Sequence, residues 1–269
     1  MKRILTFILT LTLALSFCVN SFAAATTATA SETQTGTSEA QTDTSKTQAG
    51  TSEAQTDTSK VQAGASYGIS NLSGAPDIVA ESAVVMDANT GTILYGKEAD
   101  TKRYPASITK VMTALLAVEN CKMSDVITYS NAAVNGIEAG SSTAGINVGA
   151  KLTVEDSLYA LMLVSANEAA AAIAEHISGS TTEFAKLMTK RAKELGCTNT
   201  QFKNPHGLPN EEHYTTAHDM GLILKEAMKH EEFRKISGTI SYTLKKSDTL
   251  KDTLELWNHA KILRENSDY

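Results

Sequence analysis

The chain has 269 residues, of which 42% are hydrophobic and 6% aromatic, a length that suits one or two globular domains. Its 24 basic and 30 acidic side chains give a formal net charge of −6, and this acidic balance argues against a nucleic-acid-binding protein, which normally carries a basic surface. Three cysteines without a Cys-x-x-Cys pair exclude a disulfide scaffold and a standard zinc module.

Residues 1–25 are predicted to be a cleavable secretory signal peptide. Lys2 and Arg3 precede an apolar run over residues 4–19, and small residues follow at 23–25. The apolar run is shorter than the ~20 residues that a membrane-spanning helix needs, so a signal is favoured over a membrane anchor. We therefore expect an exported protein, whose net charge after loss of the two basic residues is 22 − 30 = −8.

Residues 26–74 are predicted to be a disordered linker. The fourteen residues TQTGTSEAQTDTSK at 33–46 recur as TQAGTSEAQTDTSK at 47–60. The repeat contains no aromatic or large aliphatic side chain, so stacked repeats would bury almost nothing and a solenoid is excluded. Its polar composition cannot offset the entropy lost on ordering. Two interpretations stay open, a tether that holds the following domain away from a surface and a repeat without function.

Cys121 and Cys197 are the cysteines that remain once the signal is removed. An exported protein could join them in a disulfide. Nothing in the sequence brings them together, so we favour two free, buried thiols.

Residues 75–269 are predicted to form one α+β domain, a hairpin followed by a cluster of helices. Apolar runs at 82–87 and 92–95 around the Asn- and Gly-containing segment 87–91 indicate a β-hairpin. The first helix is expected to start at Pro105, and its buried face consists of Ile108, Val111, Met112 and Leu115.

Further helices are expected along the rest of the chain. A capping box at 153–156 opens one helix, which breaks near 165–167, and an Ala-rich helix follows to residue 176. Two more are predicted at 182–195, where Gly196 ends the helix, and from 216 to about 230. The segment 202–208 is expected to be a loop because it contains Asn-Pro and His-Gly pairs.

Ser107 and Lys110 form the only Ser-x-x-Lys sequence in the chain, and residues three apart share one face of a helix. In the first turn, the Ser107 hydroxyl could attack a carbonyl while free N–H groups hold the oxyanion. Lys110, one turn further and partly desolvated, loses its proton more easily and could act as the base. Chance alone supplies roughly one such pair in a chain so rich in serine, so a solvated lysine beside an ordinary serine is the competing interpretation.

A second candidate motif is Ser165-Ala-Asn167, placed where a helix is expected to break. Side chains at such a break can point into a cleft, so the Ser165 hydroxyl could relay a proton and the Asn167 amide could hold a substrate peptide group. Helix capping is the alternative role for both residues.

Several other polar and aromatic residues are assigned structural roles. The spacing of His206, His213, His218 and Asp219 matches no standard set of metal ligands, and Asp219 follows Thr216 as a capping partner would. The aromatic residues predicted to lie in the core are Phe233, Tyr242 and Trp257.

These motifs together resemble a known family. Pro-Ala-Ser-Ile-Thr-Lys-Val-Met-Thr at 105–113, Ser-Ala-Asn at 165–167 with Glu-His-Ile following at 175–177, and the stretch 193–208, from Lys-Glu-Leu-Gly to Asn-Pro-His-Gly-Leu, are similar to those of the low-molecular-mass serine D-alanyl-D-alanine carboxypeptidases (peptidase S11). These are penicillin-binding proteins of the peptidoglycan layer. The similarity runs from about Ala80 to Trp257.

The resemblance implies a β-lactamase/penicillin-binding-protein-like fold and an acyl-enzyme route without metal or other cofactor. It assigns Ser107 as the nucleophile, Lys110 as its proton acceptor, Ser165 as a proton relay and Asn167 as a substrate-binding residue. The implied partners are peptidoglycan stem peptides ending in D-Ala-D-Ala and β-lactam antibiotics. The implied location is extracytoplasmic, in the cell wall or at the outer face of the cytoplasmic membrane.

One family motif has no counterpart in these 269 residues. No Lys-Thr-Gly or Lys-Ser-Gly occurs, and the nearest string is Lys-Lys-Ser-Asp at 245–248. In the family this motif supplies the cation that anchors the substrate carboxylate, on a strand that lines the cleft. We therefore expect a C-terminally truncated member with an incomplete sheet, poor stability and little or no activity, whose missing C-terminal region could have associated with a membrane surface.

Three alternative functions remain from the sequence. A D-Ala-D-Ala endopeptidase shares every motif. A class A-like β-lactamase shares Ser-x-x-Lys. At the second motif, however, that class has Ser-Asp-Asn, whereas this chain has Ala166 in the middle position. The glutamate with which that class activates the deacylating water has no evident counterpart here. A non-catalytic cell-wall-binding remnant is the interpretation that follows if the truncation is genuine.

Overall fold

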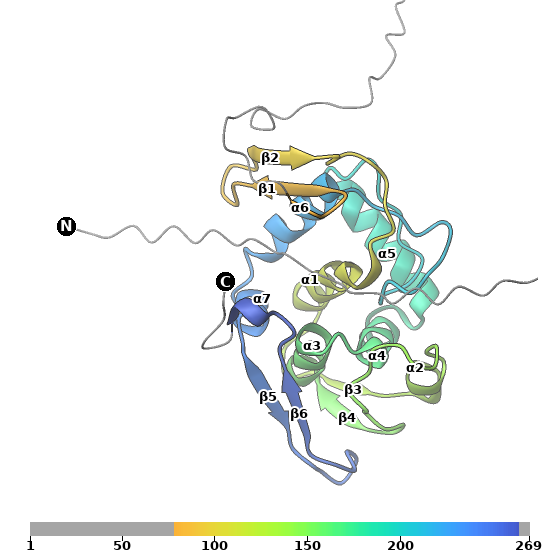
Figure 1. Ribbon diagram of the computed structural model, residues 1–269. Helices are drawn as coiled ribbons and strands as arrows, with labels where there is room; N and C mark the ends of the chain where they lie inside the picture. Colours follow the sequence, from red (N-terminus) through yellow and green to blue (C-terminus); the bar gives the residue numbers. More distant parts are fainter. Residues whose placement is uncertain (1–77, 264–269) are drawn as a thin grey trace, which may run out of the picture. The chain divides into compact units, whose positions relative to one another are not determined.

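The computed structural model describes residues 78–263, which lie within a single unit of the chain (Figure 1). The predicted signal and linker, and Cys18, lie outside the described residues. A helical cluster and three two-stranded antiparallel sheets make up the described part, as expected for the α+β class. Its elements are β1 (Ala83–Met86), β2 (Ile93–Lys97), η1 (Ala106–Thr109), α1 (Lys110–Asn120), β3 (Val126–Thr128), α2 (Asn131–Asn135), β4 (Lys151–Thr153), α3 (Val154–Leu163), α4 (Asn167–Ser178), α5 (Thr181–Glu194), α6 (Ala217–Ala227), α7 (Glu231–Ser237), β5 (Ser241–Leu244), β6 (Leu254–Trp257) and η2 (Lys261–Leu263).

Helix α1 runs through the middle of the helical cluster and contacts α3, α4, α5, α6 and α7 (Figure 1). Its residues from Met112 to Ala117 are at most 1% exposed, which confirms Met112 and Leu115 of the predicted buried face. Ile108 and Val111 of that face are only partly buried and pack against the core. Each fully buried leucine of this core stabilises the fold by about 1.5–3 kcal/mol. The small alanines of α4, all buried between 169 and 174, let neighbouring helices approach closely. The turn that carries Ser107 therefore leads into a helix whose middle is fully buried.

Strands β1 and β2 form the predicted hairpin. The Asp87 carboxylate closes its turn by accepting hydrogen bonds from the N–H groups of Asn89 and Thr90. One face of the hairpin packs on α6, where Gly221 lies close to Val84 and Met86. Among residues 78–263 the hairpin pairs with no other strand.

The capping box at the start of α3 is confirmed. The Thr153 hydroxyl accepts from the Asp156 N–H at 3.0 Å, and the Asp156 carboxylate accepts from the Thr153 N–H at 3.2 Å. The helix ends at Leu163, and α4 begins at Asn167, so the predicted break is also confirmed. At the break, Ser165 has a φ of +59°, a left-handed conformation that non-glycine residues rarely adopt.

The predicted helix from 216 to about 230 is confirmed as α6, and a further helix, α7, which the sequence did not predict, follows it. Helix α6 ends at Ala227, His230 is extended, and α7 begins at Glu231. No glycine or proline marks this break in the sequence. The bend allows Phe233 and Ile236 of α7 to be buried, at 3% and 2% exposed.

One core prediction is wrong. Trp257 is 55% exposed, although Phe233 is buried and the Tyr242 ring stacks on Tyr159 with centroids 3.7 Å apart. Successive residues of a strand face opposite sides, and the register of β6 gives the buried side to Leu256. The prediction used residue type without this register.

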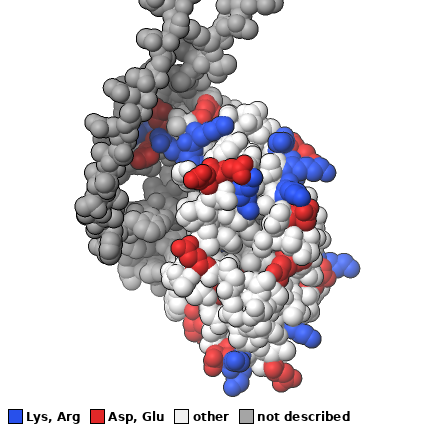
Figure 2. All heavy atoms as spheres, turned by 90° about the vertical axis from the view of Figure 1, so that its right-hand side faces the viewer, with Lys and Arg blue, Asp and Glu red and all other residues white. Residues whose placement is uncertain are grey.

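Cys121 and Cys197 are free thiols, as favoured from the sequence, but Cys121 is only partly buried. Cys197 is buried, and desolvation raises its thiol pKa to about 12, so it stays protonated at neutral pH. Across residues 78–263, no helix is both long enough and apolar enough to cross a bilayer. On the face drawn in Figure 2, basic and acidic side chains are interspersed.

Candidate active site

Ser107 lies in the tight turn η1 that leads into α1. The turn begins after Pro105, and Ala106 takes a positive φ of +50° to start it. The sequence predicted one α-helix from Pro105, whereas the first turn is a 3₁₀ turn and α1 itself begins at Lys110. The shared face is nevertheless formed, because Lys110 Nζ lies 3.3 Å from Ser107 Oγ.

Lys110 is a buried amine with two oxygen neighbours. It is 3% exposed, and its Nζ donates to the His206 carbonyl oxygen at 2.8 Å besides contacting Ser107 Oγ. Burial lowers the pKa of the amine to about 7, against the opposing effect of the Glu168 charge. About half of the Lys110 amines are then neutral at pH 7, so they can accept a proton from a neighbouring hydroxyl.

The loop at 204–208 covers Lys110. Asn204 Oδ1 accepts hydrogen bonds from the N–H groups of His206 and Gly207, and Thr113 Oγ1 donates to the Pro205 carbonyl at 2.6 Å. Gly207 has a φ of +86° and lies against the Ala106 carbonyl so closely that a Cβ would meet its oxygen at 1.8 Å. The contact between this loop and the turn that carries Ser107 is therefore made by the backbone of Gly207 and not by a side chain.

His206 contributes its carbonyl oxygen to Lys110, which fits the structural role predicted for it. Burial, the Lys110 charge and His213 together lower its imidazole pKa to about 4. His213, whose pKa burial also lowers to about 4, hydrogen-bonds Thr109 Oγ1 at 3.0 Å. Both imidazoles are neutral at pH 7, so neither adds positive charge beside Lys110.

Ser165 and Asn167 lie at the corner between α3 and α4, two helices that α1 contacts. Ser165 Oγ and Asn167 Oδ1 are buried and have no hydrogen-bond partner among the described residues. A buried polar atom without a partner destabilises a fold by about 1–3 kcal/mol, and such atoms call for a functional explanation. The corner is connected with Lys110 through the packing of α4 on α1, and the charge of Glu168, next to Asn167, opposes the effect of burial on the Lys110 pKa.

The remaining polar residues considered in the sequence analysis cap a helix or fix loops through hydrogen bonds and an ion pair. Thr216 caps α6 by accepting from the Asp219 N–H, as predicted, while Asp219 Oδ2 accepts from Asn199 and Thr200. His218 pairs with Asp100 at 2.9 Å. Two groups of possible metal ligands occur in the described part, and neither includes a candidate site residue; they are Cys121, Asp125 and His176, and Glu119, Glu226 and His230.

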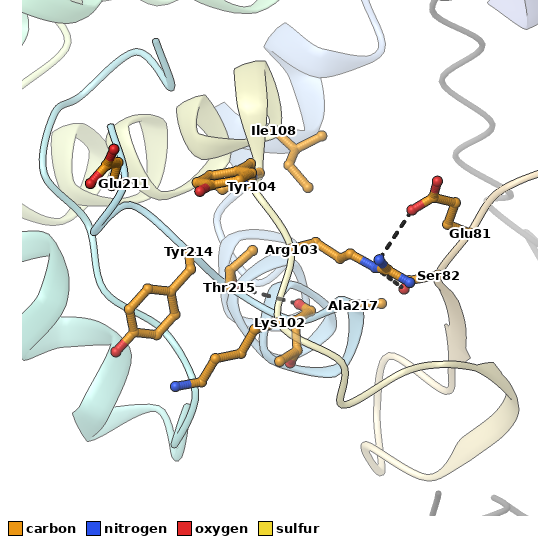
Figure 3. Close-up of a pocket in the computed structure, with 12 residues that line it drawn as sticks. Glu81, Ser82, Lys102, Arg103, Tyr104, Ile108, Glu211, Tyr214, Thr215 and Ala217 are labelled. Carbon is orange, nitrogen blue, oxygen red and sulfur yellow. Dashed lines mark hydrogen bonds and ion pairs between the residues drawn. The ribbon is translucent and has the colours of Figure 1, made fainter. Parts of the chain in front are cut away.

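A pocket of about 690 Å³ lies beside the Ser107 turn (Figure 3). It is lined by residues that include Tyr104 and Pro105, but not by Ser107, Lys110, Ser165 or Asn167. Arg103 pairs with Glu81 at 3.1 Å on one wall, and Lys102 lies over the Tyr214 ring. The candidate catalytic side chains therefore do not line this pocket. The contact between Lys110 Nζ and Ser107 Oγ is the feature that indicates acyl transfer.

Sequence analysis missed two residues of this region. Gly207 and Glu168 look ordinary in the sequence, one as a turn glycine and one as an acid in the first turn of a helix, where acids favour the dipole. Their contacts come from segments far along the chain. No local signal identified them.

Comparison with known proteins supports the resemblance. The family model described as D-alanyl-D-alanine carboxypeptidase, Peptidase_S11, matches residues 70–268. The D-alanyl-D-alanine carboxypeptidase DacF of Bacillus subtilis is 42% identical over 177 residues, which are 64% of this chain and 45% of that protein. The Streptomyces K15 DD-transpeptidase crystal structure superposes with a TM-score of 0.66 at 33% identity, over 72% of this chain and 79% of that one.

A further structural neighbour is the D-alanyl-D-alanine carboxypeptidase DacD of Francisella tularensis, with a TM-score of 0.61 and 29% identity over 70% of this chain and 57% of that one. The chain spans less than half the length of the B. subtilis relative and just over half that of the F. tularensis protein. Both solved structures support the β-lactamase/penicillin-binding-protein-like fold expected from the motifs.

Proposed function

The chain belongs to the peptidase S11 family of D-alanyl-D-alanine carboxypeptidases, and from this membership and the geometry at Lys110 we propose that the protein removes the terminal D-alanine from peptidoglycan stem peptides through an ester on Ser107. The observation that carries the proposal is the buried Lys110 amine, with a pKa near 7, at 3.3 Å from Ser107 Oγ. An amine that is partly neutral at physiological pH is what a serine hydroxyl needs as its base.

The first half of the reaction acylates Ser107. The neutral Lys110 amine takes the Ser107 hydroxyl proton while Oγ bonds to the carbonyl carbon of the penultimate D-alanine. The carbonyl electrons move to oxygen, and the N–H of Ser107 helps to hold that oxyanion. The carbon–nitrogen bond then breaks, and the Ser165 hydroxyl relays the proton from Lys110 to the departing D-alanine nitrogen.

The second half hydrolyses the ester. Water attacks the acyl carbon, its proton passes to Lys110, and the Ser107 oxygen leaves with a proton returned by the same amine. Asn167 holds the substrate by its side-chain amide, and its partnerless Oδ1 is suited to accept from a substrate peptide N–H. No metal or other cofactor takes part in these steps.

A penicillin provides the test, because the same attack by Ser107 opens the lactam ring and leaves a stable ester. The sequence lacks the Lys-Thr-Gly that binds the substrate carboxylate in the family, so we expect slow, sub-stoichiometric labelling during long exposure to excess fluorescent penicillin. Ser107→Ala should abolish the label, and Ser124→Ala, at an exposed serine, should not. Failure to detect Ser107-dependent labelling, or equal labelling of Ser107→Ala, would contradict the proposal.

The reaction products distinguish a carboxypeptidase from the alternative activities, an endopeptidase and a β-lactamase. Release of D-alanine from a monomeric pentapeptide is expected of a carboxypeptidase, whereas cleavage of cross-linked muropeptides alone would indicate an endopeptidase. Rapid turnover of the penicillin would indicate a β-lactamase.

Export is part of the same proposal. The substrate lies outside the cytoplasmic membrane, and residues 1–25 fit a signal peptide. Mass spectrometry of the secreted protein should show an N-terminus close to residue 26, and retention of residues 1–25 would contradict export by cleavage. Association of a C-terminal region beyond residue 269 with the membrane surface is proposed from the family resemblance. Flotation with anionic liposomes of a protein extended to the end of its reading frame, compared with residues 26–269, tests it.

A further inference from the structure

Glu168 occupies an unusual position beside the candidate site. It follows Asn167 in the first turn of α4 and is 2% exposed. One of its carboxylate oxygens, Oε1, accepts from four donors of a single loop: Thr143 Oγ1 at 2.6 Å and the N–H groups of Ala144, Gly145 and Ile146 at 2.8, 3.1 and 3.4 Å. A glutamate of the helical cluster therefore anchors a loop that lies more than twenty residues away in the sequence.

This loop, residues 136–150, connects α2 to β4. Its Ser142 carbonyl also accepts from the backbone N–H of Asn167, at 3.0 Å. The loop is therefore attached to two successive residues of the corner, Asn167 through the backbone and Glu168 through the side chain. Movement of the loop would move the start of α4, and with it the Asn167 amide.

The second carboxylate oxygen, Oε2, is buried without a hydrogen-bond partner in the described part of the chain. The N-terminal end of α4 favours a negative charge there, but an anchor alone does not require that charge, because a glutamine carbonyl accepts the same N–H bonds. Burying a carboxylate with a free oxygen is costly. The charge therefore calls for a second explanation.

Lys110 provides that explanation. Its amine contacts Ser107 Oγ and the His206 carbonyl, and the His206 imidazole is neutral. Helix α1, which begins at Lys110, packs on α4, which carries Glu168. The negative charge of Glu168 favours the protonated amine and so opposes desolvation. Without an opposing charge, burial would make the amine a weaker base, and base strength sets how readily it accepts the Ser107 proton.

We propose that Glu168 is a positioning residue for acyl transfer, which fixes the loop 142–146 and the start of α4 at Asn167 through one carboxylate oxygen and holds a buried negative charge there. This inference rests on the proposed function for its catalytic meaning. Its two physical components, loop anchoring and electrostatic tuning, can be measured without any turnover.

Two substitutions separate the components. Glu168→Gln keeps an acceptor for the loop and removes the charge, whereas Glu168→Ala removes both. Glu175→Gln, a partly buried glutamate on the same helix, is the matched control. The readouts are amide hydrogen exchange at residues 143–146 and the NMR titration of Lys110 after selective ¹³C labelling of lysine side chains, with the resonance assigned by Lys110→Met.

We expect Glu168→Gln to titrate Lys110 at a lower pH than wild type and to retain most of the loop protection. Glu168→Ala should speed exchange at Ala144 and Gly145 about tenfold, because charge-assisted bonds are lost. An unchanged Lys110 midpoint in Glu168→Gln would overturn the electrostatic part, and it remains decisive if Glu168→Ala does not fold. Wild-type exchange in a folded Glu168→Ala would overturn the anchoring part. Absence of penicillin labelling with both effects present would instead refute the proposed function.

Discussion

Replacing Gly207 with alanine tests how the loop at 204–208 shapes the site. Gly207 has a φ of +86°, and an added Cβ would lie 1.8 Å from the Ala106 oxygen, 2.4 Å from its carbonyl carbon and 2.9 Å from Thr109 Oγ1. The first two atoms are backbone and cannot rotate away. The loop must therefore move from the turn that carries Ser107.

The destabilisation has two parts. A left-handed alanine costs about 1–2 kcal/mol wherever it occurs. Displacing the loop also weakens the bonds of the Pro205 and His206 carbonyls to Thr113 and Lys110, and each buried group left without a partner costs about 1–3 kcal/mol. If both carbonyls lose their partners, we expect a loss of about 3–8 kcal/mol in the free energy of unfolding.

Urea unfolding followed by circular dichroism measures this loss, with Gly179→Ala as the matched control. Gly179 has a similar φ of +76°, but a Cβ there meets nothing within 4 Å, so only the conformational cost of about 1–2 kcal/mol applies. In a folded Gly207→Ala protein the Lys110 titration should also move toward higher pH, because water reaches the amine. Equal destabilisation by the two substitutions would refute the close packing of the loop.

Three further predictions concern stability. Lys110→Met should raise the free energy of unfolding at pH 7, because the pKa of the Lys110 amine falls from 10.5 to about 7 on folding. The wild-type protein should therefore gain up to about 5 kcal/mol of stability as the pH rises from 7 to 10.5. Unfolding measured at pH 7 and pH 10 should show this gain only in the wild-type protein. Thr153→Ala should cost about 1 kcal/mol in urea unfolding through loss of the capping box, and no change would contradict its role. The pKa values of His206 and His213 fall from 6.5 to about 4 on folding, so stability should be lost as pH falls from 6.5 through 4, by up to about 3 kcal/mol each; His213→Gln should lessen that loss, and equal acid sensitivity would argue against it.

The sequence predicted those features that depend on neighbouring residues. The hairpin, the buried face of α1 and the Thr153 capping box are set by spacings of a few residues; the hairpin and the capping box are confirmed, and the buried face is confirmed at Met112 and Leu115. The break at Ser165 was also predictable, because Ser and Asn interrupt helices by bonding to nearby backbone. Ser107 and Lys110 share a face for the same local reason.

Features that depend on tertiary packing were not predictable. Gly207 meets Ala106 across about a hundred residues of chain, and Glu168 meets the loop at 143–146. The exposure of Trp257 follows from the pairing register of β6 with β5, which composition does not determine. The burial that lowers the Lys110 pKa likewise depends on the distant loop that carries His206.

The central claim is that a neutral Lys110 activates Ser107, and the pH dependence of Ser107 acylation tests it most directly. Acylation by excess penicillin, followed by intact-protein mass spectrometry from pH 5 to 9, should increase with a midpoint near pH 7, the pKa to which burial brings the amine. Lys110→Met should abolish it. Acylation of folded Lys110→Met at the wild-type rate would contradict the claim.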